Sequence, residues 1–414
     1  MITLLRLLVV LFTVWNATAA GAFLPSENTG GARGDGVADD TAALQRVLDS
    51  GGTVVLGAGK TYRITRRLDI TRDGSGILGD GTATLLMGAG AGAFDNAAPE
   101  KKYAPNATAI LATNVVGVRI EGLRIRYGTQ IDDRHVKAMA LRGCRDFRIA
   151  GNDISNFSLA DGIVYVGASQ DGVITGNAIH SSHTNSKTRG QISGIVLDDD
   201  DKGSSRIEIS GNHIYDLTVG PEFFAKFNAQ TDGINLTMRT AHVDVTGNRI
   251  ENVGEGIDSF ATDTTIVRNR IVNARAFGIK LFHGASRTVV RRNDIVDAGI
   301  GGIVIGGAAA GLRDSADNVI EGNRIRGVNR DGGAGRFTTF GIGILRGKPG
   351  ATRVVRTRIM GNDIELGGNA LFGVLAESGS GNDNEVSGNS ISGSSRESYR
   401  LDPVTVPRAL TGAE

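Results

Sequence analysis

Cysteine, proline and aromatic residues are scarce in this sequence, and their scarcity excludes several classes of protein. Cys144 is the only cysteine, so the chain cannot close an internal disulfide. Only 7 prolines and 5% aromatic residues stand beside 60 glycines. This composition is typical of many short strands joined by tight turns and argues against a helical bundle.

An excess of charge of one sign is also absent. Lysine and arginine together number 45, and aspartate and glutamate together number 44. A protein that binds nucleic acid needs a large positive surface to neutralise phosphates. Nucleic acid is therefore not an expected partner, and the sequence leaves the oligomeric state open.

Long apolar runs are missing except near the N-terminus. Arg6 precedes an apolar run from Leu7 to Trp15, and small residues follow at 17–20, which predicts a signal peptide over residues 1–20. The run is shorter than the ~20 apolar residues that a membrane helix needs. We therefore expect a secreted or periplasmic protein without membrane contact after cleavage.

A tetrad of the form Gly/Arg-Asn-x-Ile recurs nine times, at spacings of 21 to 39 residues. Its asparagines are Asn152, Asn177, Asn212, Asn248, Asn269, Asn293, Asn323, Asn362 and Asn389. A fixed signature at variable spacing indicates one structural coil per repeat, with insertions that loop out of the stack. We expect each asparagine to take the left-handed backbone of a corner, and their amides to form a ladder along the axis.

A second marker, a glycine followed by a β-branched residue, alternates with the first. It occurs at Gly162, Gly194, Gly233, Gly256, Gly278, Gly302, Gly341 and Gly373. Around both markers apolar residues fall at every second position, which is the period of a β-strand. Strands without intervening helices pair in parallel when the chain coils and stacks each turn on the last. The pattern therefore predicts an all-β solenoid.

The segment before the repeats looks like a cap. Residues Ala43, Leu44, Val47 and Leu48 share one side of a short amphipathic helix, with Asp39 or Asp40 as its N-cap. We expect an N-terminal cap and first coils over residues 21–110, a parallel β-helix with Asn-x-Ile repeats over 111–395 and a C-terminal tail over 396–414.

Residues 31–65, GARGDGVADDTAALQRVLDSGGTVVLGAGKTYRIT, resemble the N-terminal part of the pectate-lyase superfamily of β-helices, and the Asn-x-Ile coils are similar to that superfamily's repeat. The resemblance covers nearly the whole mature chain. It implies a right-handed, single-stranded parallel β-helix with an N-terminal capping helix. It also implies a polysaccharide partner, while the reaction differs among members of the superfamily.

Polar residues interrupt the outward face of three consecutive coils. If Ile234, Ile257 and Ile279 point inward, the residues that follow them, Asn235, Asp258 and Lys280, point outward and stack ~5 Å apart. We expect them to lie side by side on a solvent-facing ribbon. The same position holds Val164, Val196, Val304 and Gly343 in other coils.

Further candidate residues surround this trio. Just before the marker glycine, the outward row contains Asp232 and Glu255, next to Ser193, Phe277 and Asp161. Two residues beyond the trio, the row contains Asp198, Phe260 and Phe282, with His283 and Arg239 close by. We expect Asp232, Glu255, Asp258 and Lys280 to be catalytic. We expect Asn235, Arg239, Phe260, Phe282, His283 and Asp198 to bind substrate.

Loop lengths favour a groove at the same place. Short connections end at Gly256, Gly278 and Gly302, whereas long ones end at Gly194, Gly233 and Gly341. Residues 180–191 and 218–231 would form a wall that offers Phe223, Phe224, Lys226 and Phe227 to a sugar chain. A groove suits an extended polymer, because binding is spread over several units.

The segment Thr231-Asp232-Gly233-Ile234 resembles the Asn-Thr-Asp-Gly motif of the polygalacturonase family, and Glu255 falls where that family has the second member of an aspartate pair. The family's preceding aspartate is Gly254 here, its motif histidine is Phe277, and its Arg-x-Lys motif is replaced at 302–305. A pattern of carboxylates on adjacent coils is what the two sequences share.

Several reactions fit these residues. Carboxylates on adjacent coils favour glycoside hydrolysis of an extracellular polysaccharide, which needs an acid and a base and no metal or other cofactor. The alternative is β-elimination or uronate epimerisation with Lys280 as the base, and Ca²⁺ is expected only for a lyase. A non-catalytic polysaccharide-binding or surface protein is the third alternative.

Overall fold

The computed structural model describes residues 26–88, 107–128, 136–157, 162–184, 191–198, 202–219, 230–307, 311–330, 332, 334–335, 337–347, 350–403 and 405–406. The expected signal peptide at 1–20 lies outside these residues. Asp161 and the wall residues Phe223, Phe224, Lys226 and Phe227 lie outside them too.

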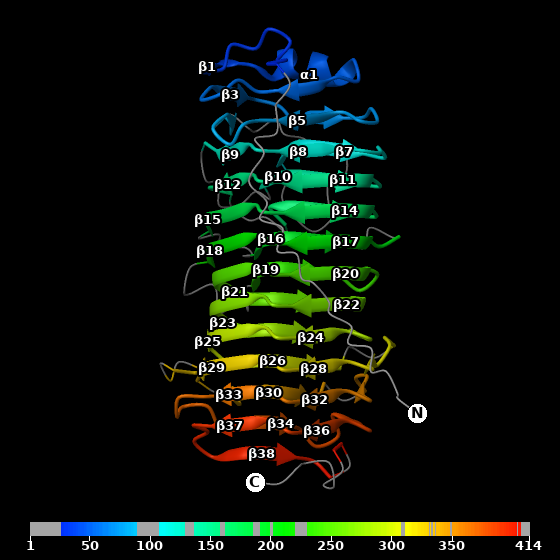
Figure 1. Cartoon of the computed structure of the whole chain (residues 1–414), viewed down its shortest axis with the longest axis vertical. Coiled ribbons are helices and arrows are strands. Elements are labelled where there is room, and N and C mark those ends of the chain that lie inside the picture. The colour runs from blue at the N-terminus through cyan, green and yellow to red at the C-terminus, as the bar shows by residue number, and fades with distance from the viewer. Residues whose placement is uncertain are drawn as a thin grey trace, which may run out of the picture.

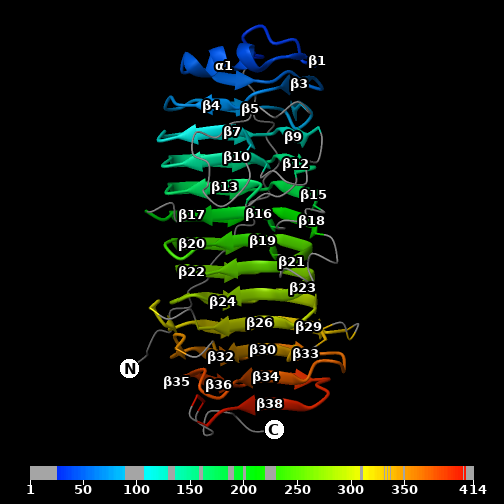
Figure 2. The same ribbon diagram turned by 180° about the vertical axis from the view of Figure 1, so that it is seen from behind.

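The described strands stack into a parallel β-helix with three faces, and every pairing between named strands on these faces is parallel (Figure 1). One coil visits the faces in turn, as in β14 (Gln170–Thr175), β15 (Ala178–Thr184) and β16 (Gln191–Asp198). Figure 2 shows the stack from behind, with α1 (Thr41–Asp49) at one end and β38 (Glu397–Leu401) at the other. The predicted solenoid is confirmed.

Face A is a separate sheet of twelve strands. Its strands are β2 (Thr53–Val55), β5 (Gly76–Leu78), β8 (Arg119–Glu121), β11 (Arg145–Ala150), β14 (Gln170–Thr175), β17 (Ser205–Ser210), β20 (Ala241–Thr246), β22 (Thr262–Val267), β24 (Val289–Arg291), β28 (Val319–Glu321), β32 (Arg358–Met360) and β36 (Glu385–Ser387). The short strands β27 (Ser315–Ala316), β31 (Val354–Val355) and β35 (Gly381–Asn382) pair beside it.

Faces B and C are joined because two long strands, β21 (Arg249–Ser259) and β23 (Arg270–Leu281), run through the corner between them. Face B also contains β1 (Asp35–Asp39), β3 (Thr61–Ile64), β6 (Thr84–Met87), β9 (Arg124–Tyr127), β12 (Asp153–Ser155), β15 (Ala178–Thr184), β18 (His213–Val219), β25 (Asp294–Ala298), β29 (Arg324–Val328), β33 (Asp363–Glu365) and β37 (Ser390–Ser392). Face C also contains β4 (Leu68–Ile70), β7 (Ala107–Thr113), β10 (Val136–Arg142), β13 (Val164–Gly167), β16 (Gln191–Asp198), β19 (Gln230–Leu236), β26 (Gly301–Gly306), β30 (Phe340–Leu345), β34 (Phe372–Ala376) and β38 (Glu397–Leu401).

Isoleucines of both markers fill the interior. The isoleucines of successive Asn-x-Ile tetrads stack on one another along face B. Ile250 pairs with Ile271, for example, and both side chains are fully buried. On face C, Ile234, Ile257 and Ile279 do the same. Burial of one such side chain is worth ~1.5–3 kcal/mol relative to exposure, so the stacked columns hold the coils together.

The asparagine ladder is confirmed. The amide nitrogen Nδ2 of Asn248 donates to Oδ1 of Asn269 at 2.9 Å and to the carbonyl oxygen of Ile209 at 2.9 Å. The same pair of bonds recurs from Asn152 to Asn362. These asparagines are buried, and the ladder satisfies polar groups that would otherwise be costly in the interior.

The prediction that each ladder asparagine has a left-handed backbone conformation was wrong by one residue. The left-handed position is taken by the residue before each asparagine, for example Gly247 with φ 65° and Arg268 with φ 56°. The turn is complete before the asparagine, which leaves its side chain free to point inward along the axis. This explains why the tetrad begins with glycine in most repeats.

The capping helix α1 (Thr41–Asp49) packs on β2 and β4 and buries Leu44, Val47 and Leu48, as the sequence predicts. Asp40 occupies the N-cap position, but its side chain does not cap the helix. Its oxygens instead accept hydrogen bonds from the backbone N–H groups of Arg33 and Gly34. At the other end, β38 lies within the segment expected as a tail and adds a strand to β34.

Candidate functional site

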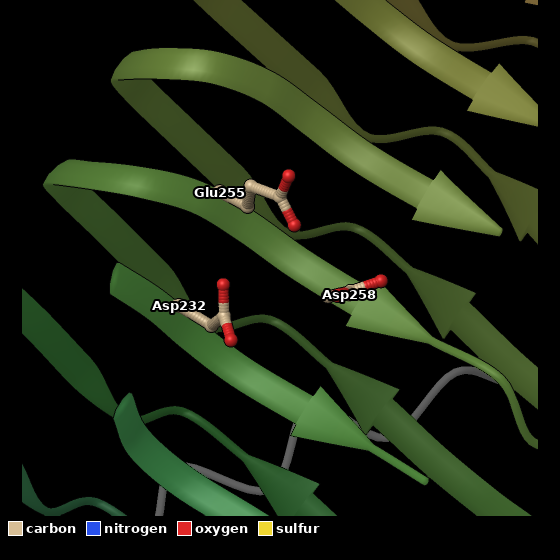
Figure 3. Close-up of side chains that lie close together, drawn as sticks. All are labelled: Asp232, Glu255 and Asp258. Atoms are coloured by element: carbon tan, nitrogen blue, oxygen red, sulfur yellow. The ribbon is translucent and has the colours of Figure 1, made fainter. Parts of the chain in front are cut away.

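The register expected for the outward residues of face C is confirmed. Asn235 pairs with Asp258 across β19 and β21, and Asp258 pairs with Lys280 across β21 and β23. Asp232 pairs with Glu255 in the same strands. Figure 3 shows the carboxyl groups of Asp232 and Glu255 side by side on neighbouring strands, with Asp258 further along the strand that carries Glu255.

The expectation that these residues face solvent was wrong. Asp232 and Asp258 are 0% exposed, and Asn235, Glu255 and Lys280 are each 7% exposed. Strand alternation places them on the outward side of face C, but an outward side chain is exposed only if nothing packs over it. The four ionisable groups therefore form a buried cluster, called here the carboxylate–lysine cluster: Asp232, Glu255, Asp258 and Lys280.

Lys280 lies between two of the carboxylates. Its Nζ donates to Oε2 of Glu255 at 2.8 Å and to Oδ2 of Asp258 at 2.9 Å. The side chains of Lys280 and Glu255 each keep 9% of their surface exposed, whereas that of Asp258 keeps none. Glu255 and Lys280 are thus the members of the cluster that reach the surface.

Asp232 is held by neutral groups. Its Oδ2 accepts hydrogen bonds from Nδ2 of Asn235 at 3.2 Å and from Oγ of Ser193 at 3.3 Å. The second oxygen, Oδ1, is buried without a hydrogen-bond partner, as is Oδ1 of Asp258. A buried carboxylate oxygen without a partner favours the protonated acid.

The electrostatics of the cluster follow from its burial. Burial raises the pKa of Asp232 to about 7, and the neighbouring Glu255 carboxylate adds to the shift. Burial also raises the pKa of Asp258 well above its usual range, although Lys280 opposes this. Burial acts to lower the pKa of Lys280, but Asp258, Glu255 and Asp232 outweigh it, so that pKa is raised. At neutral pH Lys280 is a cation, and Asp232 is close to half protonated.

Aromatic rings adjoin the cluster, as expected. Nζ of Lys280 lies 5.5 Å from the ring centre of Phe282 and 5.8 Å from that of Phe260. The ring of His283 meets Phe260 edge-on at 4.5 Å. Burial and the nearby Lys280 charge lower the pKa of His283, so this ring is neutral at neutral pH.

The two remaining substrate-binding candidates lie away from the cluster. Asp198, the last residue of β16, accepts a hydrogen bond from the hydroxyl of Tyr165 at 2.7 Å. Arg239 is exposed in the turn that follows β19. The structure therefore brings together Asp232, Glu255, Asp258, Lys280, Asn235, Phe260, Phe282 and His283, but it does not add Asp198 or Arg239 to them.

One position of the outward row was misassigned. The sequence alignment of coils places Val164 beside Val196, but Tyr165 pairs with Val196, and Val164 is an inward residue beside Ile195. Gly162 causes the offset, because it has φ 98° and lies before β13 rather than within it. Tyr165 thus belongs to the outward face of the coils preceding the cluster.

Apolar residues flank the cluster on both sides along face C. Ala140, Tyr165 and Val196 pack together on the preceding coils. Val304, Phe340, Phe372 and Leu375 pack with Phe277 and Phe282 on the following coils. The cluster therefore lies between two apolar groups on the outward side of face C, and the cluster and both groups are called here the outer stripe of face C.

Two family models match parts of the chain. The model of the right-handed beta helix region matches residues 141–313, which contain the carboxylate–lysine cluster. The model of the N terminal extension of bacteriophage endosialidase matches residues 32–74, which contain α1. No curated protein gives a significant match to the sequence.

Solved structures share the fold at low sequence identity. The A-module of mannuronan C-5 epimerase AlgE4 from Azotobacter vinelandii has a TM-score of 0.59 at 17% identity, over 91% of this chain and 97% of that one. The surface adhesin PfbA of Streptococcus pneumoniae has a TM-score of 0.62 at 14% identity, over 89% and 91%. The catalytic domain of a GH87 α-1,3-glucanase has a TM-score of 0.56 at 12% identity, over 90% and 64%.

These similarities establish the architecture. Within the described residues, no helix has the length and apolar character of a membrane span. The stacked coils, the parallel pairings and the matched repeat region agree with one another and with the resemblance noted in the sequence. The chain is a right-handed parallel β-helix protein.

Proposed function

We propose that this protein is an enzyme that hydrolyses glycosidic bonds of an extracellular polysaccharide at the carboxylate–lysine cluster. The observation that carries the proposal is the presence of three carboxylates within 4.8 Å of one another on adjacent coils. Two of them have raised pKa values. Similar folds include a glucanase and a mannuronan epimerase, which act on polysaccharides.

Each group has a distinct role in this proposal. Asp232, whose pKa is about 7, is the acid that protonates the leaving oxygen, and substrate binding must uncover its carboxyl group, which is fully buried in the free protein. Glu255, which reaches the surface, is the carboxylate that attacks the sugar. Lys280 bonds to Glu255 and orients its carboxyl group, and Asp258 holds Lys280 in place. Oxygens of these carboxyl groups lie within 4.8 Å of one another, closer than the ~6.5–9.5 Å separation that leaves room for a water in inverting glycosidases, so retention of anomeric configuration is expected.

Elimination and epimerisation with Lys280 as the base are disfavoured. Both reactions need a neutral amine, whereas the carboxylates raise the pKa of Lys280. Ca²⁺ fits poorly as well, since the Lys280 ammonium already bonds to two of the three carboxylates that would hold the ion. We therefore derive no step through a metal.

Incubation of the protein with a panel of acidic and neutral polysaccharides tests the proposal. New reducing ends and saturated oligosaccharide products by mass spectrometry are expected with the wild type. Asp232→Asn and Glu255→Gln should each lower kcat/KM by at least ~10²-fold, the contribution of a positioned acid or base. Asp263→Asn, which changes a half-buried carboxylate of face A, is the matched control and should leave activity unchanged.

Two results would contradict this reaction. Ultraviolet-absorbing unsaturated products that disappear with a chelator would indicate a lyase. Binding without new products on every polymer, in wild type and variants alike, would indicate a surface or binding protein, as the similarity to an adhesin allows.

The pH dependence of the reaction gives an independent test. Because Asp232 must be protonated to act as the acid, kcat/KM should fall as the pH rises through about 7. The measurement is the initial rate at low substrate concentration from pH 4 to 9. A rate that increases through pH 7 would remove Asp232 from the role of acid.

A further inference from the structure

A concave site lies on face C near its C-terminal end. It is a pocket of about 420 Å³ beside β34 and β38. Leu371, Phe372 and Leu375 form its apolar part. Its charged part comes from Glu377, Arg396, Arg400 and Asp402. Apolar walls with a few polar groups are typical of small-ligand sites.

Two arginines dominate the chemistry of this pocket. The guanidinium carbons of Arg400 and Arg396 lie 5.3 and 6.0 Å from the ring centre of Phe372. Both side chains are exposed, and no carboxylate of the described residues forms an ion pair with either. Arginines elsewhere in the described chain, such as Arg287 and Arg356, form short bonds with aspartates.

Both acidic residues of the pocket accept hydrogen bonds from backbone N–H groups. Oε2 of Glu377 accepts a hydrogen bond from the N–H of Arg346 at 2.8 Å, and Oδ2 of Asp402 accepts one from the N–H of Gly379 at 3.0 Å. The planar donors of the two arginines are therefore the groups available to a ligand. Such donors match a carboxylate.

The pocket and the carboxylate–lysine cluster share one face. Pairing runs from Lys280 through Val304, Gly343 and Leu375 to Arg400. Four steps of ~4.8 Å between strands separate the two ends by ~19 Å. The aromatic part of the outer stripe, which includes Phe282 and Phe340, lies between them.

We infer that this arginine pocket binds a carboxylate-bearing sugar unit of the polymer that is cleaved at the cluster, so that the substrate is an acidic polysaccharide. The inference rests on the proposed function for the place of cleavage. The binding itself depends only on Arg396, Arg400 and the apolar wall.

Binding measurements in the Asp232→Asn background test the inference without cleavage. The probes are hexamers of galacturonate and of mannuronate, with maltohexaose and xylohexaose as neutral probes. Replacing both arginines (Arg396→Gln with Arg400→Gln) should weaken binding of at least one acidic hexamer at least ~10-fold, since the hydrogen bonds from a charged donor to the sugar carboxylate are lost. The double control Arg287→Gln with Arg356→Gln removes the same charge from paired sites and should change binding less than ~2-fold.

Equal binding of the acidic hexamers before and after loss of Arg396 and Arg400 would overturn the inference, as would tighter binding of the neutral probes. Failure of the proposed function is recognised separately. In that case the wild type releases no products, while arginine-dependent binding of the acidic hexamers persists.

Discussion

Two acid–base pairs of this protein, one exposed on face A and one buried on face C, respond in opposite ways to the same kind of contact. Asp263 accepts bonds from Arg287 at 2.6 and 2.7 Å, and this lowers the pKa of Asp263. Asp258 accepts a bond from Lys280 at 2.9 Å, yet burial raises the pKa of Asp258. The surroundings, rather than the partner, decide which protonation state the carboxyl prefers.

The exposed pairs form a regular surface pattern. Asp171 with Arg206, Asp263 with Arg287 and Asp317 with Arg356 are all bonded across neighbouring coils. Such pairs contribute little stability, because water screens them. A contact between opposite charges thus marks a candidate site only where desolvation accompanies it.

Removal of Lys280 should give the largest difference in stability between the buried Asp258–Lys280 pair and the Asp263–Arg287 pair. Lys280→Met leaves Glu255 and Asp258 buried without their counter-charge, so stability should fall by ~3–5 kcal/mol at pH 8. The loss should be smaller at pH 5, because the raised pKa of Asp258 favours its neutral acid there. Thermal unfolding followed by circular dichroism measures both. Arg287→Met is the matched exposed control and should lower the free energy of unfolding by at most ~1 kcal/mol. Equal losses in the two variants would contradict a larger contribution from the buried pair.

The pH dependence of stability should sharpen the comparison. Folded Asp232 keeps its proton up to about pH 7, whereas the ordinary pKa of an aspartate, as in the unfolded chain, is 3.8. The folded state binds more protons between these values, so the stability contributed by protonated Asp232 is lost as the pH rises through about 7. Asp232→Asn should reduce this decline by up to a few kcal/mol, since one pKa unit is worth ~1.4 kcal/mol.

Asp263→Asn gives the opposite control. The pKa of Asp263 is lowered in the folded state, so its contribution is present above 3.8 and is lost as the pH falls through the folded value. Melting temperatures of the wild type and both variants between pH 3 and 9 measure the two trends. A wild-type melting temperature that rises from pH 5 to 8 and is unaffected by Asp232→Asn would contradict the assignment.

A smaller effect is expected for neutral polar groups in the same interior. Asn248→Ala removes bonds to Asn269 and Ile209 and leaves buried groups of neighbouring coils without partners. The expected cost is ~1–3 kcal/mol. Asn389→Ala, at the half-buried end of the ladder, should cost less. Chemical denaturation compares the two variants, and equal costs would show that ladder position does not matter.

The sequence predicted the coils and the register of the site because both depend on local, repeated signals. Alternation around the Gly-Ile marker was sufficient to place Asn235, Asp258 and Lys280 in one row. It failed at Val164, where the positive φ of Gly162 shifts the strand by one residue. The spacing of apolar residues does not predict the backbone dihedral angles of a single glycine.

Burial of the site could not be predicted in the same way. Strand alternation gives the side to which Asp258 points, but not what packs over that side. The arginine pocket was missed for a related reason. Arg396 and Arg400 follow the last repeat, and only the pairing of β38 with β34 places them beside Phe372.

The shared strands β21 and β23 have a consequence for how this molecule can change over time. In each strand, inward and outward residues alternate. The inward Ile257 and Ile279 stabilise the scaffold, and the outward Asp258 and Lys280 provide the chemistry. Replacing one outward residue alters the chemistry of the cluster while the isoleucine stack stays intact. New specificities can therefore arise one coil at a time, without a new architecture.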